Sequence, residues 1–269
     1  MSPARQRLPV VDPANWSLSV SWHAVDVAEV DDDVDLPAVA IVAGTAIRGL
    51  AATLMMQGVM RRHPNAFLVT LERWGVTIPL HESQSYVRQA ISDGLERMDR
   101  DLDEPVVVVG HSQGGLAALR YGVDHPGQAR RIVTVGAPWN GARLAGTVNG
   151  LARRLIRRDV PALADMTPDS PFLQALHADV PAIAERVTNI YSTHDGLIEP
   201  YVSAHIPVDG VTNVLVATWD EYERHVRRFG LSHPIDELIE GRVNHLAEMS
   251  DPQIRSVIWR VVDELDRSL

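Results

Sequence analysis

The chain has 269 residues, of which 45% are hydrophobic and 22% charged, and this balance excludes a disordered chain, a collagen-like fibre and a coiled coil. The formal net charge is −10, from 25 Lys and Arg against 35 Asp and Glu, so no nucleic-acid partner is expected. There is no cysteine, which excludes disulfides, cysteine-ligated metal centres and thiol catalysis.

The first residues carry charge but no apolar run behind it, so no signal peptide is visible. The sequence as written therefore predicts a cytoplasmic protein, and secretion after removal of a leader stays open. No stretch approaches the roughly 20 apolar residues of a membrane span. We expect a single domain over residues 1–269.

Short apolar segments alternate with longer amphipathic ones along the chain. Residues 106–109 are four consecutive valines, and a strand without a polar face is typical of a parallel sheet covered by helices. The alternation predicts an α/β fold with a mostly parallel, doubly wound sheet. The predicted strands cover residues 17–25, 39–42, 67–70, 106–109, 132–135, 188–191 and 211–216.

Helices are predicted between these strands, and the last one has Asp251 as its N-cap and Pro252 at its first position. Two stretches interrupt the alternation. Residues 138–187 predict a cap or pocket wall, and residues 218–243 predict either a second lid or a plain excursion of the chain. The other predicted helices cover residues 50–62, 83–101 and 116–124.

The strongest functional signal is the segment Gly-His-Ser-Gln-Gly-Gly at residues 110–115. It follows the buried strand at 106–109 and opens the helix at 116–124. A Gly-x-Ser-x-Gly turn in this setting exposes the serine hydroxyl at the carboxyl end of the sheet. No lysine follows, so the spacing does not fit a phosphate-binding loop. We therefore predict that Ser112 is a catalytic nucleophile.

A serine nucleophile needs amide donors for the oxyanion that forms on the substrate. One donor is expected from Gln113, the residue after the nucleophile, and the other from the loop after the strand at 39–42. That loop reads Ala-Gly-Thr-Ala, and Gly44 lets the backbone turn so that the Thr45 amide points into the site. The alternative is that Gly44 and Thr45 only end a strand and cap a helix.

The nucleophile needs a histidine base and a carboxylate that orients it, in the chain order Ser, Asp or Glu, His. Asp195 lies just after the predicted strand at 188–191 and precedes a glycine, so it is the predicted acid. Asp209, Glu199 and Asp220 are rival acids, and an Asp-Gly pair is also a common turn.

The chain contains 11 histidines, and the base is expected between the last strand and the last helix. His225, His233 and His245 lie there. His225 belongs to a charged segment typical of a solvated helix face, and His233 precedes a proline. His245 lies in a short loop before the last helix, so it is the preferred base and His233 the second candidate. No carboxylate set accompanies these histidines, so no metal or other cofactor is predicted.

At these segments the sequence resembles serine lipases of the α/β-hydrolase superfamily, and more specifically those of the Candida antarctica lipase B type and their bacterial relatives. The resemblance extends from about residue 38 to residue 203. The Gly-x-Ser-x-Gly turn is shared by many hydrolases, whereas the pair Thr45 and Gln113 is more specific. The matching pieces are Val-Ala-Gly-Thr at 42–45, Ser-Gln-Gly-Gly at 112–115, Gly-Ala-Pro at 136–138, and Tyr-Ser at 191–192 followed by Asp195.

The resemblance implies an α/β-hydrolase fold and a helix at residues 144–159 that borders the substrate pocket, so that Leu144 and Leu151 contact the substrate. Trp139 follows the predicted strand at 132–135 closely enough to border the site as well. For the nucleophile, the acid and the two oxyanion donors, the resemblance implies Ser112, Asp195, Thr45 and Gln113.

These observations predict a serine carboxylic-ester hydrolase, a lipase or esterase, that acts on a small-molecule ester or lipid through a covalent acyl-enzyme. The alternatives are an acyltransferase, thioesterase or amidase with the same triad, and a non-catalytic binding protein on the same scaffold. Residues 148–163 carry arginines on one side of an amphipathic helix, which predicts either transient contact with a lipid surface or a solvated helix. The sequence does not decide the oligomeric state.

Overall fold

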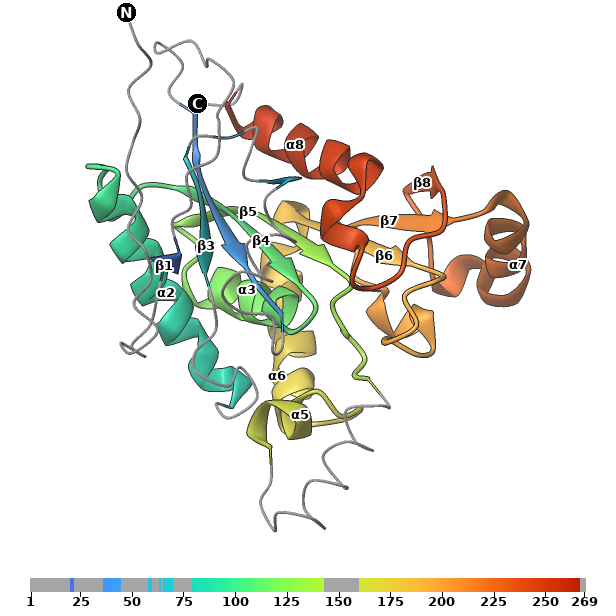
Figure 1. Cartoon of the computed structure of the whole chain (residues 1–269). Coiled ribbons are helices and arrows are strands. Elements are labelled where there is room, and N and C mark those ends of the chain that lie inside the picture. Colours follow the sequence, from blue (N-terminus) through green and yellow to red (C-terminus); the bar gives the residue numbers. More distant parts are fainter. Residues whose placement is uncertain are drawn as a thin grey trace, which may run out of the picture.

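The computed structural model describes residues 20–21, 36–44, 58–59, 63, 65–69, 79–142 and 160–266. Within them, eight strands form one sheet in the order β1-β3-β2-β4-β5-β6-β7-β8 (Figure 1). β1 pairs antiparallel with β3, and all other neighbours are parallel. The mostly parallel sheet predicted from the sequence is confirmed. The strands are β1 (Val20–Ser21), β2 (Ala38–Val42), β3 (Ala66–Val69), β4 (Val106–His111), β5 (Ala129–Val135), β6 (Val187–Ser192), β7 (Thr212–Ala217) and β8 (Glu237–Glu240).

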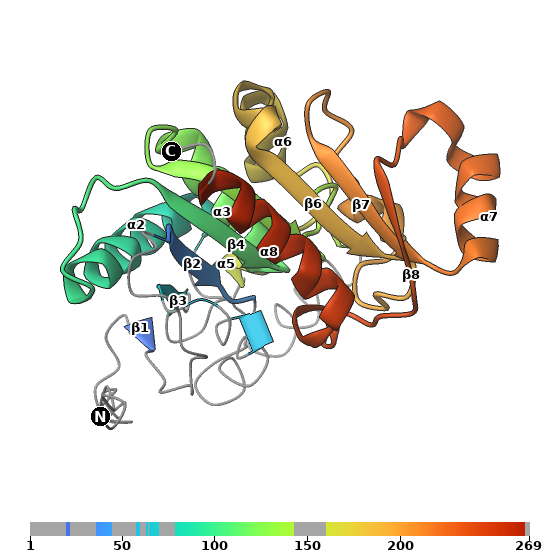
Figure 2. The same ribbon diagram turned by 90° about the horizontal axis from the view of Figure 1, so that it is seen from above.

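The sheet has a hydrophobic core on each face because successive side chains of a strand point to opposite faces. On one face, Val106 and Val108 of β4 pack in a cluster with α2 (Leu80–Arg97) and α3 (Gln113–Asp124). On the other face, Val107 and Val109 pack with α8 (Pro252–Asp266). Figure 2 shows α8 crossing one face while α2 and α3 lie on the other. The four-valine strand is therefore buried on both sides, as its composition predicts.

The start of α8 is fixed by the predicted cap. Asp251 Oδ1 accepts hydrogen bonds from the Gln253 amide at 2.9 Å and from the Ile254 amide at 3.1 Å. Pro252 is the first helical residue, where its missing N–H leaves no intrahelical bond unmade. Because the loop before α8 carries His245, this cap also sets where that loop ends.

Residues 138–187 contain α5 (Pro161–Asp165), α6 (Pro171–Asp179) and the 3₁₀ helix η1 (Val180–Arg186). Leu173, Leu176 and Val180 are fully buried in the same core as α3, so this half of the stretch belongs to the helical layer. Residues 143–159 lie outside the described part of the chain. A role of the stretch as a cap stays a prediction.

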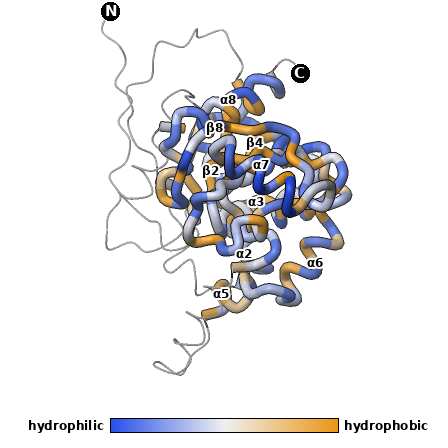
Figure 3. Tube along the Cα trace, turned by 90° about the vertical axis from the view of Figure 1, so that its right-hand side faces the viewer, coloured by the Kyte–Doolittle hydropathy of each residue, from blue (hydrophilic) through white to orange (hydrophobic). Residues whose placement is uncertain are grey.

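Residues 218–243 fold into α7 (Trp219–Phe229) and β8, and β8 extends the sheet by pairing parallel with β7. β8 was not expected from the sequence, because Glu-Leu-Ile-Glu has only two apolar residues and only Ile239 is buried. Figure 3 shows α7 as strongly hydrophilic, and the capping box of Thr218 and Glu221 stabilises its start. A lid role for this stretch stays a prediction.

Two predicted elements lie mainly outside the described residues. Of the predicted helix at 50–62, only residues 58–59 are described, and they are helical. Of the predicted strand at 17–25, only β1 is described. Among the described helices, none combines the length and apolar composition needed to cross a membrane.

Candidate active site

Ser112 forms a strained turn between β4 and α3. β4 ends at His111, α3 begins at Gln113, and Ser112 between them has φ 55° and ψ −126°. A positive φ is uncommon for a residue with a side chain and costs on the order of 1–3 kcal/mol. The Ser112 amide donates to the Val135 carbonyl at 2.8 Å, which ties the turn to the end of β5. The predicted strand–serine–helix turn is present.

The glycines around Ser112 are required by close backbone contacts. A Cβ at Gly110 would lie 2.3 Å from the Gly114 carbonyl oxygen, and a Cβ at Gly114 would lie 2.3 Å from the Val42 carbonyl oxygen. A Cβ at Gly44 would lie 2.9 Å from the Ser112 Cβ, so the backbone after β2 passes directly beside the serine. Gly44 therefore lies where one side of an oxyanion hole is expected.

The two expected oxyanion donors differ in what the structure describes. Gln113 is buried and is the first residue of α3, next to Ser112. Thr45 lies outside the described residues. The oxyanion hole therefore stays a prediction, supported on one side by Gln113 at the helix start and on the other by the approach of Gly44.

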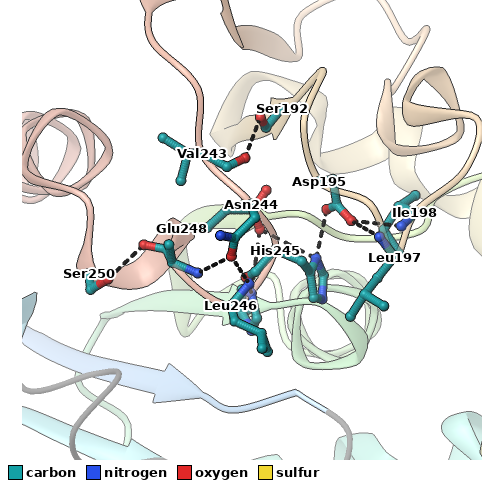
Figure 4. A network of polar contacts seen from close by, with 12 residues as sticks. Ser192, Asp195, Leu197, Ile198, Val243, Asn244, His245, Leu246, Glu248 and Ser250 are labelled. Carbon is teal, nitrogen blue, oxygen red and sulfur yellow. Dashed lines mark hydrogen bonds and ion pairs between the residues drawn. The ribbon is translucent and has the colours of Figure 1, made fainter.

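Asp195 follows β6, as predicted, and each of its carboxylate oxygens has partners. Oδ1 accepts hydrogen bonds from the amides of Leu197 at 2.8 Å and Ile198 at 2.7 Å, and Oδ2 lies 2.6 Å from Nδ1 of His245 (Figure 4). Burial alone would raise the pKa of Asp195, but the hydrogen bond and charge of His245 and the two amides hold it below its usual value. The site therefore favours the carboxylate form.

His245 lies in the loop between β8 and α8, and its side chain is only 5% exposed. The His245 amide donates to the Asp195 carbonyl at 3.0 Å, and the Ser192 hydroxyl donates to the Val243 carbonyl at 2.7 Å. The loop after β6 that carries the predicted acid Asp195 (the acid loop) and the loop before α8 that carries the predicted base His245 (the base loop) are thus joined by backbone and side-chain contacts. Because Nδ1 donates to Asp195, Nε2 of the neutral ring is left as the proton acceptor.

His111 brings the base loop next to the serine turn. Its Nε2–H donates to the His245 carbonyl at 3.0 Å, and the two rings lie 4.7 Å apart. Burial lowers the pKa of His111 to about 4, although the His245 carbonyl and the charge of Asp195 act in the opposite direction. His111 is therefore a neutral contact between the residue before Ser112 and the predicted base.

The rival candidates lie elsewhere. Glu199, Asp209 and Asp220 are exposed, whereas Asp195 is buried. His225 is buried, and its Nε2 donates to the His233 carbonyl at 3.0 Å. The ring of His233 packs beside those of His205 and His225, so the two rival histidines belong to a separate cluster. The structure brings Asp195 and His245 together, and it does not bring His233 to Asp195.

The predicted substrate contacts are described only in part. Trp139 is buried, its ring lies 4.3 Å from that of His177 on α6, and its carbonyl oxygen contacts His177 Nε2 at 2.8 Å. Leu144 and Leu151 lie outside the described residues. Substrate contact by these three residues stays a prediction.

One residue of the site was missed. Glu248, in the 3₁₀ helix η4 (Glu248–Ser250), is completely buried, and its Oε2 lies 3.6 Å from Nδ1 of His245 and 3.4 Å from Nε2 of His111. Its place three residues after His245 is the only sequence signal, and it does not distinguish a buried glutamate from a solvated one.

Comparison with known proteins adds to this geometry. No family model matches the chain. The homoserine O-acetyltransferase of Clavibacter michiganensis is 34% identical over 94 residues, which are 34% of this chain and 23% of that enzyme, so the match spans less than a quarter of its length.

Solved structures match over most of the chain. The mature lipase of Bacillus licheniformis has a TM-score of 0.52 at 12% identity and covers 88% of this chain and 96% of its own. The meta-cleavage product hydrolase of Pseudomonas fluorescens has a TM-score of 0.54 at 12% identity, over 85% of this chain and 91% of its own. This chain has the α/β-hydrolase fold.

The narrower resemblance to lipase B enzymes stays a prediction. Aspergillus fumigatus lipase B has a TM-score of 0.50 at 14% identity and covers 79% of this chain and 54% of its own. At this identity the likeness shows a shared fold. The function of this chain therefore depends on the residues of its own site.

Proposed function

We propose that the protein is a serine hydrolase that cleaves carboxylic esters, with Ser112 as nucleophile, His245 as general base and Asp195 as the acid that orients it. The observation that carries this proposal is the 2.6 Å contact between Asp195 Oδ2 and His245 Nδ1, which joins residues 50 positions apart beside the strained turn of Ser112. Strained backbone and buried charge both cost stability, so their occurrence together favours catalysis over a binding scaffold.

The proposed reaction has two halves. In the first, Ser112 Oγ bonds to the ester carbonyl carbon while its proton passes to Nε2 of His245, and the alkoxy group then leaves with that proton. In the second, water attacks the acyl-enzyme, gives a proton to Nε2 of His245 and releases the acid, and the proton returns to Ser112. Asp195 stabilises the imidazolium that forms in each half.

Oxyanion stabilisation in this proposal comes from backbone amides. The Gln113 amide at the start of α3 is one expected donor, and the Thr45 amide is the other. The chemistry needs no metal or other cofactor. The expected substrate is a small-molecule ester or a lipid, with Trp139, Leu144 and Leu151 as expected pocket residues and transient contact with a lipid surface as a further expectation.

A fluorophosphonate, which reacts with activated serines, tests the proposal directly. We expect a covalent adduct that mass spectrometry locates on Ser112, together with turnover of aryl esters. Ser112→Ala should abolish both, and aryl esters from acetate to palmitate would show whether the enzyme prefers short or long acyl chains. Full turnover by Ser112→Ala would refute the proposal.

Acyl transfer is the second candidate, and the similarity to homoserine O-acetyltransferase over 94 residues favours it. The same triad would form the same acyl-enzyme, but an alcohol would replace water in the second half. Product analysis with an ester donor and competing alcohols, homoserine among them, separates the two. Mainly free acid indicates hydrolysis, and mainly new ester indicates transfer.

A further inference from the structure

A second carboxyl group is buried directly against the Asp195–His245 pair. The Glu248 side chain is only 1% exposed, and neither of its oxygens accepts a hydrogen bond from an N–H or O–H group among the described residues. By contrast, Asp195 accepts two backbone amides and the His245 N–H. An ionised carboxylate in the position of Glu248 would lack the donors that stabilise charge in a buried site.

The backbone makes room for this side chain. Gly136, just after β5, has φ +57°, and a Cβ there would lie 2.2 Å from Glu248 Oε2 and 3.1 Å from His245 Nδ1. A side chain at this position would therefore occupy the place of the Glu248 carboxyl. The absence of a Cβ at Gly136 allows the carboxyl to sit beside the base.

The groups around Glu248 do not supply a positive charge that would hold it ionised. The titratable groups that face it are Asp195, His245 and His111. The His111 ring is neutral because burial lowers its pKa to about 4. The His245 N–H is directed at Asp195, 2.6 Å away. Two buried carboxylates beside one imidazole cannot both stay ionised without a large cost, so one of them takes a proton.

The choice between the two carboxyls follows from their partners. Asp195 has the donors that hold its pKa low, whereas burial first and the negative charge of Asp195 second raise the pKa of Glu248 well above its usual value, against the opposing effect of His245. The two carboxyl groups face the same ring nitrogen, since Nδ1 of His245 lies 2.6 Å from Asp195 Oδ2 and 3.6 Å from Glu248 Oε2. A proton shared between them must be carried by Glu248, because an ionised carboxylate has only acceptors.

We propose that Glu248 is a positioning residue that stays protonated at neutral pH and donates its carboxyl proton to Asp195, thereby fixing the carboxylate that orients His245. This inference deepens the proposed function and rests on it. Asp195 would then accept hydrogen bonds from four donors: two amides, an imidazole and a carboxylic acid. Since a carboxylate has about four lone-pair sites, this set restrains its rotation from every side.

The same cluster has the composition of a metal site, and its hydrogen bonds argue against that interpretation. His111, His245 and Glu248 offer three ligand atoms within 4.8 Å of one another. A histidine binds a metal through an unprotonated nitrogen. The ring nitrogens within 4 Å of Glu248 Oε2 are Nε2 of His111 at 3.4 Å and Nδ1 of His245 at 3.6 Å. Both carry protons, which they donate to the His245 carbonyl and to Asp195. The cluster is therefore better suited to hold a proton.

The kinetic test compares Glu248→Gln with Glu248→Met. Glutamine keeps an N–H donor for Asp195 and carries no charge, whereas methionine has a similar length and no donor. We expect kcat/KM for an aryl acetate to stay within about threefold of wild type in the glutamine variant. In the methionine variant we expect kcat/KM to fall roughly 10- to 100-fold, which is the loss typical when a hydrogen-bond partner of a metal-binding side chain is removed.

The pH profile of kcat/KM distinguishes a neutral from an ionised Glu248 through its acid limb, the range in which kcat/KM falls as the pH is lowered. This limb reports protonation of the base in the free enzyme. If Glu248 is neutral, glutamine leaves the limb in place, whereas methionine moves it to higher pH because Asp195 loses a donor. If Glu248 is ionised, glutamine removes a negative charge and moves the limb to lower pH. That shift, or a loss of kcat/KM in glutamine as large as in methionine, would overturn the inference.

Unfolding measurements test protonation without relying on catalysis. A glutamic acid that keeps its proton only when folded makes the unfolding equilibrium constant rise by up to tenfold per pH unit above about pH 4.5. Glutamine does not titrate, so we expect the wild-type constant to rise more steeply with pH than that of Glu248→Gln. Parallel curves would overturn the inference even if esters are cleaved. If the wild-type curve is steeper but the protein cleaves no ester, then Glu248 is protonated as proposed and the proposed function is refuted instead.

Discussion

Histidine rings pack together in two parts of this molecule, at similar spacing. In the site cluster, the rings of His111 and His245 lie 4.7 Å apart. In the second cluster, beside β7 and α7, the rings of His205 and His233 lie 4.8 Å apart and those of His225 and His233 lie 6.4 Å apart. Ring packing alone would not tell which cluster supplies a base.

The partners of the rings separate the two clusters. In the second cluster, Nε2 of His205 donates to the Pro234 carbonyl at 2.8 Å and Nε2 of His225 to the His233 carbonyl. In the site cluster, His245 donates to a buried carboxylate. A carbonyl partner fixes the tautomer of a neutral ring, whereas a carboxylate also stabilises the imidazolium that forms when the ring takes a proton. The carboxylate contact therefore favours His245 as the base of the proposed triad.

The largest expected difference between the clusters is kinetic. We predict that His245→Ala lowers kcat/KM for an aryl acetate by about 10⁴-fold or more, because it removes the proton acceptor of the proposed triad. His233→Ala is expected to stay within about threefold of wild type. Thermal unfolding of both variants serves as the control for folding. An equal loss of activity in both variants would contradict the prediction that only the site cluster supplies the base.

Lowering the pH is expected to have an intermediate effect, which is on the free energy of unfolding. Burial is the first cause that lowers the pKa of both His111 and His205 to about 4, against about 6.5 when unfolded. The unfolded chain therefore binds more protons between these values, so the free energy of unfolding falls as the pH drops from about 6.5 to 4. For His111 the loss is about 3 kcal/mol.

Urea denaturation between pH 4 and 8 measures how far the free energy of unfolding falls as the pH is lowered. His205→Gln keeps a donor for the Pro234 carbonyl and removes one titrating group, so its acid-dependent loss should be less steep than that of wild type. Its activity at pH 7 should be unchanged, because His205 belongs to the second cluster. Identical slopes for wild type and variant would show that His205 is not held neutral.

The smallest effect is expected from removal of the Tyr201 hydroxyl, which is hydrogen-bonded to His225 of the second cluster. Because Nε2 of His225 donates to a carbonyl, its Nδ1 accepts the hydrogen bond from the Tyr201 hydroxyl at 3.0 Å. Tyr201→Phe leaves this buried nitrogen without its partner, which should lower the free energy of unfolding by about 1–2 kcal/mol. We expect kcat to be unchanged. A large loss of activity would show that the second cluster also contributes to the site.

Features that depend on neighbouring residues could be predicted from the sequence. The turn of Ser112 was recognisable because the buried valines, the glycines and the following helix are all adjacent in the chain. The cap of α8 is equally local, since Asp251 bonds residues two and three positions away. Asp195 was predicted as the acid because it follows a strand. These signals are set by backbone geometry over a few residues.

Features that depend on distant contacts could not be predicted as well. β8 has little apolar content and is defined by its pairing with β7 at the edge of the sheet. Glu248 reads as an ordinary surface glutamate in the sequence, and its burial becomes visible only when Gly136 is placed against it. His245 could be preferred over His233 by its place before α8, but the contact that distinguishes it comes from a loop 50 residues earlier.

The hydrogen bonds that join the acid loop to the base loop have a consequence for protein engineering. Ser192 binds Val243 and His245 binds Asp195 through atoms outside the imidazole–carboxylate contact, so the two loops form one transferable unit. Grafting both loops together onto another parallel sheet would carry the proposed acid–base couple with the hydrogen bonds that join its two loops. Grafting either loop alone would leave its half of the couple without the partner that aligns it.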